Sequence, residues 1–168
     1  MTCIVGLVTP GGSYLGGDSA ASTSDFTTVS STPKVFRFGS TLVGYSGNFG
    51  NGQHAIRFLK NTPMVRKLDA FISDYEPQGP GWSLLMVEYG RIYEIDEDKG
   101  VIEAPIINGY SYAAIGSGSA VASGALFVER LDIASVHGAL TAASTHCLDV
   151  RAPFTLSLIH ISEPTRPY

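Results

Sequence analysis

The chain has 168 residues and a net charge of −4, and 44% of its residues are hydrophobic while 15% are charged. This composition fits one globular domain with a full core and excludes a disordered chain. Acidic and basic residues are interspersed, and no run reaches the roughly 20 apolar residues of a membrane span, so we expect neither nucleic-acid nor membrane binding. With two cysteines and no apparent secretory signal, we expect a reduced, cytoplasmic protein.

The first predicted elements are hairpins, because apolar, β-branched runs alternate with Gly-rich turns. The predicted strands of the first half are 3–9, 13–18, 34–38 and 41–45, with a Ser/Thr-rich loop over 19–33. Helical spacing predicts two helices between 53 and 75. A third hairpin (82–88 and 91–95) and a short strand (112–115) then precede two helices at 119–130 and 133–147.

The order of elements is strands, two helices, strands, two helices, without an internal repeat. Two sheets between two helical layers satisfy this order, because each helix pair can cover the outer face of one sheet. We therefore predict an α+β fold, a four-layer αββα sandwich, in one domain over residues 1–155.

The segment LSLIHISEPTRPY (156–168) resembles the conceptual translation of a transposase-based sequencing-library adapter. We therefore exclude it from the predicted domain and expect the natural sequence to stop near Thr155, which makes the fold C-terminally truncated. The alternative is an ordinary strand followed by a Pro-rich terminus. On the adapter interpretation, residues 156–158 can take the place of a lost strand, whereas 162–168 should be exposed and away from Thr2.

Thr2 is the first candidate for chemistry, because removal of Met1 would leave its hydroxyl beside a free α-amino group. A threonine hydroxyl is a poor nucleophile and needs an adjacent base. An α-amino group has a reference pKa of about 7.7–8.0, so it can take the hydroxyl proton near neutral pH. Taken alone, a Met-Thr start favours an unremarkable second residue, so this hypothesis depends on the residues that follow.

Two charged residues lie at predicted strand ends. Asp18 follows two glycines that carry no side chain to block it, and Lys34 follows Pro33. A lysine near the nucleophile favours its alkoxide, and an aspartate beside that lysine keeps it charged and oriented. Each residue could instead be a solvated loop charge.

Two glycine-rich turns, GYSG (44–47) and GSGS (116–119), supply backbone N–H groups that can point at a developing oxyanion. Ser117 in the second turn adds a hydroxyl to a proton network. Either turn could also do no more than connect a strand to a helix.

An N-terminal threonine before an apolar strand, followed in order by GGD, PKV, GYSG and AIGSG, resembles the proteasome β-subunit and HslV peptidases. These are N-terminal-nucleophile (Ntn) threonine peptidases. The resemblance covers the chain from Thr2 to about Thr155, and Asp18 and Lys34 lie at the family's spacings from Thr2. The resemblance implies the αββα fold and a threonine-type endopeptidase in a self-compartmentalising ring. It implies unfolded protein or peptide substrates, an AAA+ unfoldase as a possible partner, and no cofactor or metal.

The resemblance also implies a role for each motif residue at the reacting centre. Thr2 would be the nucleophile and, through its amine, the general base. Lys34 would tune the Thr2 hydroxyl, and Asp18 would pair with Lys34. The Gly47 amide would form the oxyanion hole, and Ser117 would complete the hydrogen-bond network.

Tyr45 and Ser46 would lie at the pocket for a substrate side chain. The family often carries Asp-x-x-Ser-Gly-Gly after its last helix pair, whereas this chain has HCLDVRAPF (146–154), in which we assign no equivalent Asp and Ser.

Three alternatives complete the sequence interpretation. Cys3 would be the nucleophile if processing went one residue further, but it also fits a small apolar strand residue. His54, His137 and His146 lack the spacing of a metal site or a Ser/His/Asp triad. A non-catalytic ring subunit on the same fold is the alternative function, and the joint presence of Thr2, Asp18 and Lys34 favours the peptidase.

Overall fold

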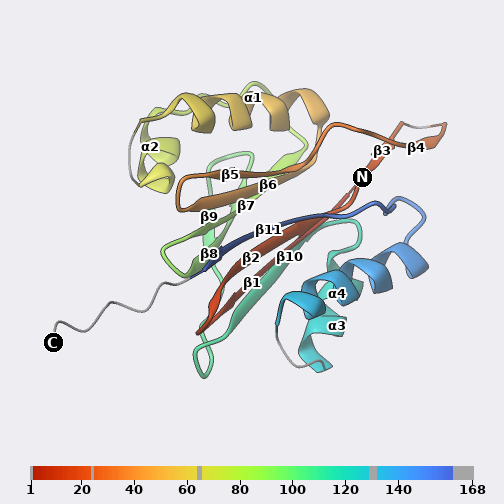
Figure 1. The fold of residues 1–168 in the computed structure, drawn as a ribbon. Helices are drawn as coiled ribbons and strands as arrows, with labels where there is room; N and C mark the ends of the chain where they lie inside the picture. Colours follow the sequence, from red (N-terminus) through yellow and green to blue (C-terminus); the bar gives the residue numbers. More distant parts are fainter. Residues whose placement is uncertain (1, 24, 64–65, 129–131, 161–168) are drawn as a thin grey trace, which may run out of the picture.

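The computed structural model describes residues 2–23, 25–63, 66–128 and 132–160, and within them two larger antiparallel sheets combine with four helices (Figure 1). The predicted mixture of helix and sheet is confirmed. One sheet has the order β10-β1-β2-β11, formed by Ser111–Gly116, Cys3–Thr9, Gly12–Gly17 and Thr155–His160. The other has the order β5-β6-β7-β8-β9, formed by Val35–Phe38, Thr41–Gly47, Trp82–Glu88, Arg91–Asp96 and Val101–Glu103.

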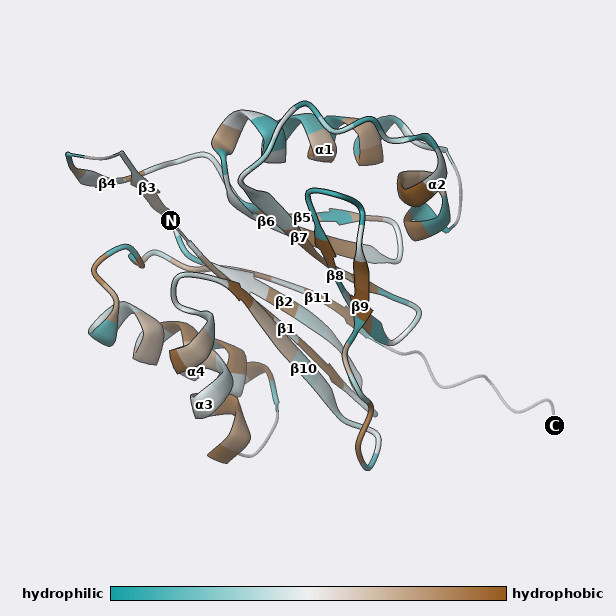
Figure 2. Ribbon diagram, turned by 180° about the vertical axis from the view of Figure 1, so that it is seen from behind, coloured by the Kyte–Doolittle hydropathy of each residue, from teal (hydrophilic) through white to brown (hydrophobic). Residues whose placement is uncertain are grey.

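The helices form two pairs, and each pair covers the outer face of one sheet (Figure 1). The pair over the β5–β9 sheet is α1 (Phe49–Asn61) and α2 (Lys67–Asp74). The pair over the other sheet is α3 (Ser119–Val128) and α4 (Ile133–His146). Figure 2 shows hydrophobic colour along β7 and β8, whereas α1 alternates between hydrophobic and hydrophilic segments, as expected of a helix with one buried face.

Strand β1 lies at the centre of the molecule, and all of its residues are buried. Alternate side chains of a strand point to opposite faces. Cys3, Val5 and Leu7 pack with α3 and α4, whereas Ile4 and Val8 pack against the second sheet. A third cluster, around Tyr45 and Phe71, fills the space beneath α1 and α2.

The strand pairing gathers several chain segments at one end of the two sheets. Because β1 runs antiparallel to both of its neighbours, its start lies beside the ends of β2 and β10, with Ile4 opposite Gly17 and Cys3 opposite Gly116. In the second sheet the start of β5 lies opposite the middle of β6, with Val35 opposite Gly44, and the Lys34 carbonyl just before β5 accepts from the Tyr45 amide. The segments that contain Thr2, Asp18, Lys34 and Gly47 therefore meet.

Two glycines allow the sheets to approach closely at this end. A Cβ at Gly17 would lie 2.7 Å from a Val35 methyl group, and one at Gly44 would lie 2.6 Å from an Ile4 methyl group. Any larger residue would push the two sheets apart, and so separate the chain segments that meet there.

The prediction of a loop over 19–33 is wrong for two short stretches. β3 (Ala20–Ser22) and β4 (Thr27–Val29) form a hairpin that extends from the body beside the N-terminal end (Figure 1). β9 was also not predicted, and α1 begins at Phe49, within the glycine-rich segment.

The segment 155–160 forms β11, which pairs with β2 along the edge of the first sheet. Residues 156–158 thus occupy a strand position, and Arg37 donates a hydrogen bond to the Leu158 carbonyl oxygen. The expected exposure of 162–168 falls outside the described residues, and the adapter interpretation of 156–168 stays a prediction. None of the described helices is both long and apolar enough to cross a membrane.

Candidate active site

Asp18 is the residue that connects the separate segments of the site. Its side chain is fully buried just after β2, and each of its oxygens accepts two hydrogen bonds. Oδ1 accepts from the Cys3 amide at 3.0 Å and from Lys34 Nζ at 3.1 Å. Oδ2 accepts from the Ala20 amide at 3.0 Å and from the Arg151 amide at 3.2 Å. Four donors around one carboxylate fix its position.

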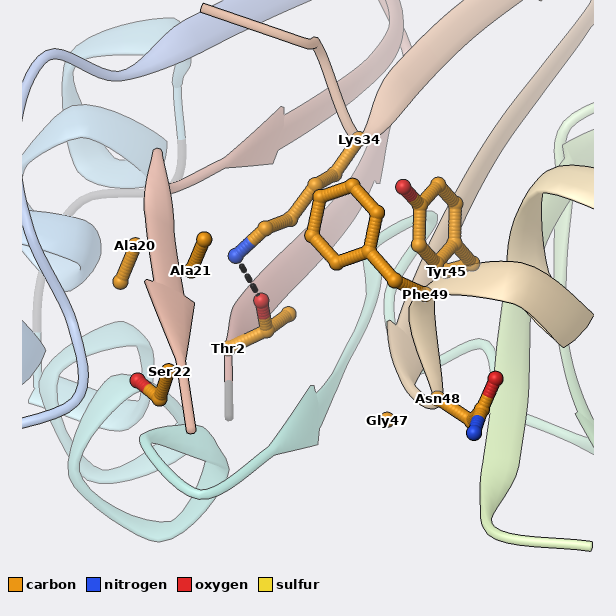
Figure 3. A pocket seen from close by; sticks show the side chains of 9 residues that line it. All are labelled: Thr2, Ala20, Ala21, Ser22, Lys34, Tyr45, Gly47, Asn48 and Phe49. Carbon is orange, nitrogen blue, oxygen red and sulfur yellow. Dashed lines mark hydrogen bonds between the residues drawn. The ribbon is translucent and has the colours of Figure 1, made fainter. Parts of the chain in front are cut away.

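Lys34 bridges Asp18 and Thr2, and Figure 3 shows its contact with the Thr2 hydroxyl. Its Nζ donates to the Asp18 carboxylate and also to the Thr2 hydroxyl oxygen. The side chain is 2% exposed. Burial lowers the pKa of Lys34 below its ordinary value, because the charged ammonium loses water, and the neighbouring Asp18 carboxylate opposes that shift. A cation beside the hydroxyl stabilises the alkoxide that forms when the hydroxyl is deprotonated.

Thr2 lies just before β1 and is 2% exposed. Its carbonyl oxygen accepts from the Gly118 amide and from the Ser117 hydroxyl, each at 3.4 Å. Gly116, at the end of β10, has a φ of +93°, and a Cβ there would overlap the Thr2 carbonyl. The turn after β10 therefore fixes the Thr2 main chain, while Lys34 holds its side chain.

A cavity of about 210 Å³ opens beside the Thr2 hydroxyl (Figure 3). One wall comes from β3, and the other comes from the end of β6 and the start of α1. Its lining residues are Thr2, Ala20, Ala21, Ser22, Lys34, Tyr45, Gly47, Asn48 and Phe49. The space is smaller than the roughly 300 Å³ at which small-molecule sites begin, so it suits one side chain of a larger ligand.

The remaining predicted site residues lie at different positions around this cavity. Gly47 lines it with a φ of +92°, and a Cβ there would overlap the Gly81 carbonyl, so only glycine fits this turn. Tyr45 also lines the cavity, with its ring packed against Phe49 at a centroid distance of 5.7 Å. Ser46 is buried beside Gly116 and is not among the lining residues.

Cys3 points away from the cavity. Its side chain is fully buried in the cluster beneath α3 and α4. Burial raises the pKa of its thiol to about 12, and the Asp18 carboxylate adds to this shift. A thiol that stays protonated and enclosed is a poor nucleophile, so the structure gives no support to the Cys3 alternative.

The loop after α4 contributes contacts that the sequence interpretation missed. The Arg151 amide donates to Asp18, and the Arg151 carbonyl accepts from the Ser19 amide at 2.9 Å. Asp149 accepts from the hydroxyls of Ser22 at 3.5 Å and Thr27 at 3.4 Å, which connects this loop to the β3–β4 hairpin. The two contacts of Arg151 use the main chain, so no residue type signals them in the sequence.

No group of three or more His, Cys, Asp or Glu side chains that could hold a metal is found among the described residues. His54 is half-buried on α1, and its Nδ1 lies 3.1 Å from the Tyr75 hydroxyl. His137 lies at the surface of α4, where its ring packs edge-on against Phe154. Neither ring lines the cavity beside Thr2.

No protein-family model matches the sequence, and no curated protein sequence matches it. Solved structures do match the fold. HslV from Trypanosoma brucei is 20% identical, with a TM-score of 0.76 over 95% of this chain and 99% of the other. BPH of Thiobacillus denitrificans in complex with epoxomicin is 16% identical, with a TM-score of 0.75 over 96% of this chain and 100% of the other. At this level of identity the likeness identifies the fold, and we conclude that this chain has the fold of the proteasome-like HslV and BPH proteins.

Proposed function

We propose that this chain is a threonine-type endopeptidase of the Ntn-hydrolase class, with an αββα fold, and that Thr2 is its nucleophile once Met1 is removed. The observation that carries the proposal is the contact of buried Lys34 with both the Thr2 hydroxyl and the Asp18 carboxylate. Burial of this ion pair is costly, because both charges lose their contact with water and only their mutual attraction compensates for it. A purely structural role therefore explains the pair poorly. The pair is useful beside a hydroxyl that must become an alkoxide.

The proposed reaction uses the main chain and side chain of one residue. The Thr2 α-amino group takes the proton of the Thr2 hydroxyl, whose oxygen attacks the carbonyl carbon of a peptide bond. The Gly47 amide stabilises the oxyanion that develops on the substrate. The amine then gives the proton to the leaving amino group, and water releases the acyl group from Thr2. Lys34 stabilises the attacking oxygen, and Ser117 keeps the Thr2 main chain in place.

Removal of Met1 is a requirement of this mechanism. While Met1 is attached, the Thr2 nitrogen is part of a peptide bond and cannot accept a proton. We therefore expect the active protein to start at Thr2, and an intact-mass measurement of the purified protein tests this directly.

The decisive experiment is covalent labelling with an epoxyketone, which reacts with both the hydroxyl and the amine of an N-terminal threonine. The likeness to BPH, whose structure holds epoxomicin, supports this choice of probe. We expect the wild type to be labelled at Thr2, and Thr2→Ala to lose labelling. Thr28→Ala, which removes an exposed hydroxyl of the β3–β4 hairpin, is the matched control and should retain it.

Labelling that persists in Thr2→Ala would overturn the assignment of the nucleophile. A wild type that starts at Thr2, is folded, and neither reacts with the probe nor cleaves peptides would favour the non-catalytic ring subunit instead.

We also infer that the chain assembles into a closed homo-oligomeric ring in the cytoplasm and receives unfolded protein from an AAA+ unfoldase. Exposed apolar side chains such as Phe26 on the β3–β4 hairpin and Phe127 on α3 support self-association. Cys3 and Cys147 are free thiols, which supports a reducing compartment. Analytical ultracentrifugation at micromolar concentration tests the ring, and a strict monomer would contradict it.

A further inference from the structure

The turn that contains Gly47 is held by the chain segment just before β7. Gly47 and Asn48 line the cavity beside Thr2, on the wall opposite Ser22 (Figure 3). The Gly81 carbonyl oxygen accepts from the Asn48 amide at 2.7 Å, and a Cβ at Gly47 would overlap the same oxygen. This carbonyl group therefore sets the position of the turn whose amide we assign to the oxyanion hole.

The Gly47 amide points away from that segment. Amide groups alternate between the two edges of a strand. The Tyr45 amide donates to the Lys34 carbonyl at 3.2 Å, so the Gly47 amide, two residues later, points to the same edge. Within the described residues, β5 does not extend to the position opposite it. A shift of the Gly81 carbonyl would thus reorient a donor on the side where Lys34 contacts Thr2.

Gly81 belongs to a loop that needs outside contacts to keep one conformation. Its φ is +82°, and glycine has more conformational freedom than any other residue. Asn51 of α1 donates from its side chain to the neighbouring Pro80 carbonyl at 3.0 Å. The Glu97 carboxylate accepts from the Gly81 amide. The contact of Glu97 thus acts on the residue whose carbonyl sets the turn.

Glu97 is carried by a turn between β8 and β9 that is itself fixed at several points. Asp96 Oδ1 accepts from the amides of Asp98 and Gly100, at 3.0 and 2.7 Å. Lys99 in the same turn donates from its Nζ to two carbonyl oxygens near the end of α2, at 2.9 and 3.2 Å. The carboxylate therefore has a support of its own and does not simply follow the loop before β7.

We propose that Glu97 is a positioning residue for peptide cleavage: its carboxylate holds Gly81, and the Gly81 carbonyl in turn holds the Gly47 amide toward the oxyanion. This inference rests on the proposed function and adds a residue that acts through the main chain of two others. The oxyanion develops in the transition state and is absent from the bound substrate. Loss of the support should therefore lower kcat and leave KM unchanged.

Variants of the full chain test the proposal with a fluorogenic peptide. We expect Glu97→Ala to lower kcat by about 3- to 10-fold, the effect of one net hydrogen bond, at unchanged KM. Glu97→Gln keeps an acceptor oxygen at the same distance from the main chain and should keep most of the wild-type kcat. Glu97→Asp keeps the charge but withdraws the carboxylate by one methylene, so its kcat should fall as in Glu97→Ala.

Asp98→Ala is the matched control. It removes the same charge from the same turn, and both side chains line one cavity outside the Thr2 site. We expect this variant to keep the wild-type kcat and KM, which separates the contact with Gly81 from a general effect of surface charge. Glu97 is only half-buried, so the variants at this position should fold, and urea unfolding checks this.

Hydrogen exchange followed by mass spectrometry tests the structural link without any catalysis. In Glu97→Ala the Gly81 amide loses its acceptor, and the acceptor of the Asn48 amide is held less firmly. Peptides that contain these two amides should therefore exchange faster than in the wild type. The same peptides should exchange at the wild-type rate in Asp98→Ala.

The possible outcomes separate the two proposals. Thr2-dependent cleavage with the same kcat in Glu97→Ala and Asp98→Ala would overturn this inference and leave the proposed function standing. A rise in KM at constant kcat, a loss in Glu97→Gln that Glu97→Asp does not show, or unchanged exchange of both amides would also overturn it. If the wild type cleaves no peptide in a Thr2-dependent reaction, the proposed function fails and this inference fails with it.

Discussion

Replacement of Asp18 by asparagine should be among the most destabilising conservative changes in the chain. Asparagine keeps one carbonyl oxygen and replaces the other by an NH₂ group, which donates. Each Asp18 oxygen accepts from two donors. In either orientation of the asparagine amide, its NH₂ group therefore faces two of these donors and cannot accept from them. Each buried donor without an acceptor costs about 1–3 kcal/mol.

The loss of charge adds a second penalty in the same variant. Lys34 would remain buried without its counter-ion, and breaking one side of a buried pair costs about 3–5 kcal/mol. The two penalties overlap because Lys34 is one of the four donors, and loss of its proton relieves part of both. We therefore expect the free energy of unfolding to fall by about 3–5 kcal/mol, which is a large part of the total for a domain of this size.

Urea unfolding of the wild type and two variants measures this effect. Asp69→Asn is the control, because it removes an exposed ion pair with Arg66 and should cost less than about 1 kcal/mol. A loss in Asp18→Asn no greater than that in Asp69→Asn would refute the assignment of Asp18 as the residue that connects the site.

Three other experiments have defined outcomes. Gly116→Ala should displace the Thr2 main chain and abolish epoxyketone labelling. Its control is Gly39→Ala, where φ is also positive but nothing lies within 4 Å of the added Cβ; this variant should lose about 1–2 kcal/mol of stability and keep its labelling. Thiol titration of the native protein at pH 8 should modify half-buried Cys147 and spare Cys3, and modification of both at equal rates would contradict the burial described here. The stability of the wild type relative to Cys3→Ala should fall by about 1.4 kcal/mol per pH unit above pH 9. The Cys3 thiol ionises near 9.0 in the unfolded chain, whereas burial raises its pKa to about 12 in the folded protein. Between these values the unfolded chain binds fewer protons than the folded protein, so rising pH favours unfolding. A difference that stays constant with pH in denaturant titrations would be incompatible with this shift.

The strands with strong alternation could be predicted from the sequence, and so could the residues that meet at their ends. Thr2, Asp18 and Lys34 were expected together, and the structure brings their side chains into contact. Apolar runs bounded by glycine fix which residues face the core. Because paired antiparallel strands put their ends side by side, the segments that follow them are placed as well.

The elements that sequence patterns missed are those in which local propensity gives little information. β3 and β4 are short and rich in Ser, Thr and Ala, and they pair with each other. The start of α1 contains three small or polar residues that resemble a loop, yet Asn48 caps it. Gly52 lies inside this helix because a Cβ there would overlap the Tyr45 ring. That reason comes from tertiary contact, which no local pattern carries.

The contact between Asp18 and the Arg151 amide joins residues 133 positions apart, and this has a consequence during protein synthesis. A ribosome releases the first hairpin well before the loop after α4 exists. The strand that pairs with β1 on its other edge, β10, also comes late in the chain. The Asp18 site is thus completed only near the end of translation, since its distant donor must first be made and then docked. For the proposed peptidase, this order keeps the growing chain free of a finished nucleophile while other nascent polypeptides are close by.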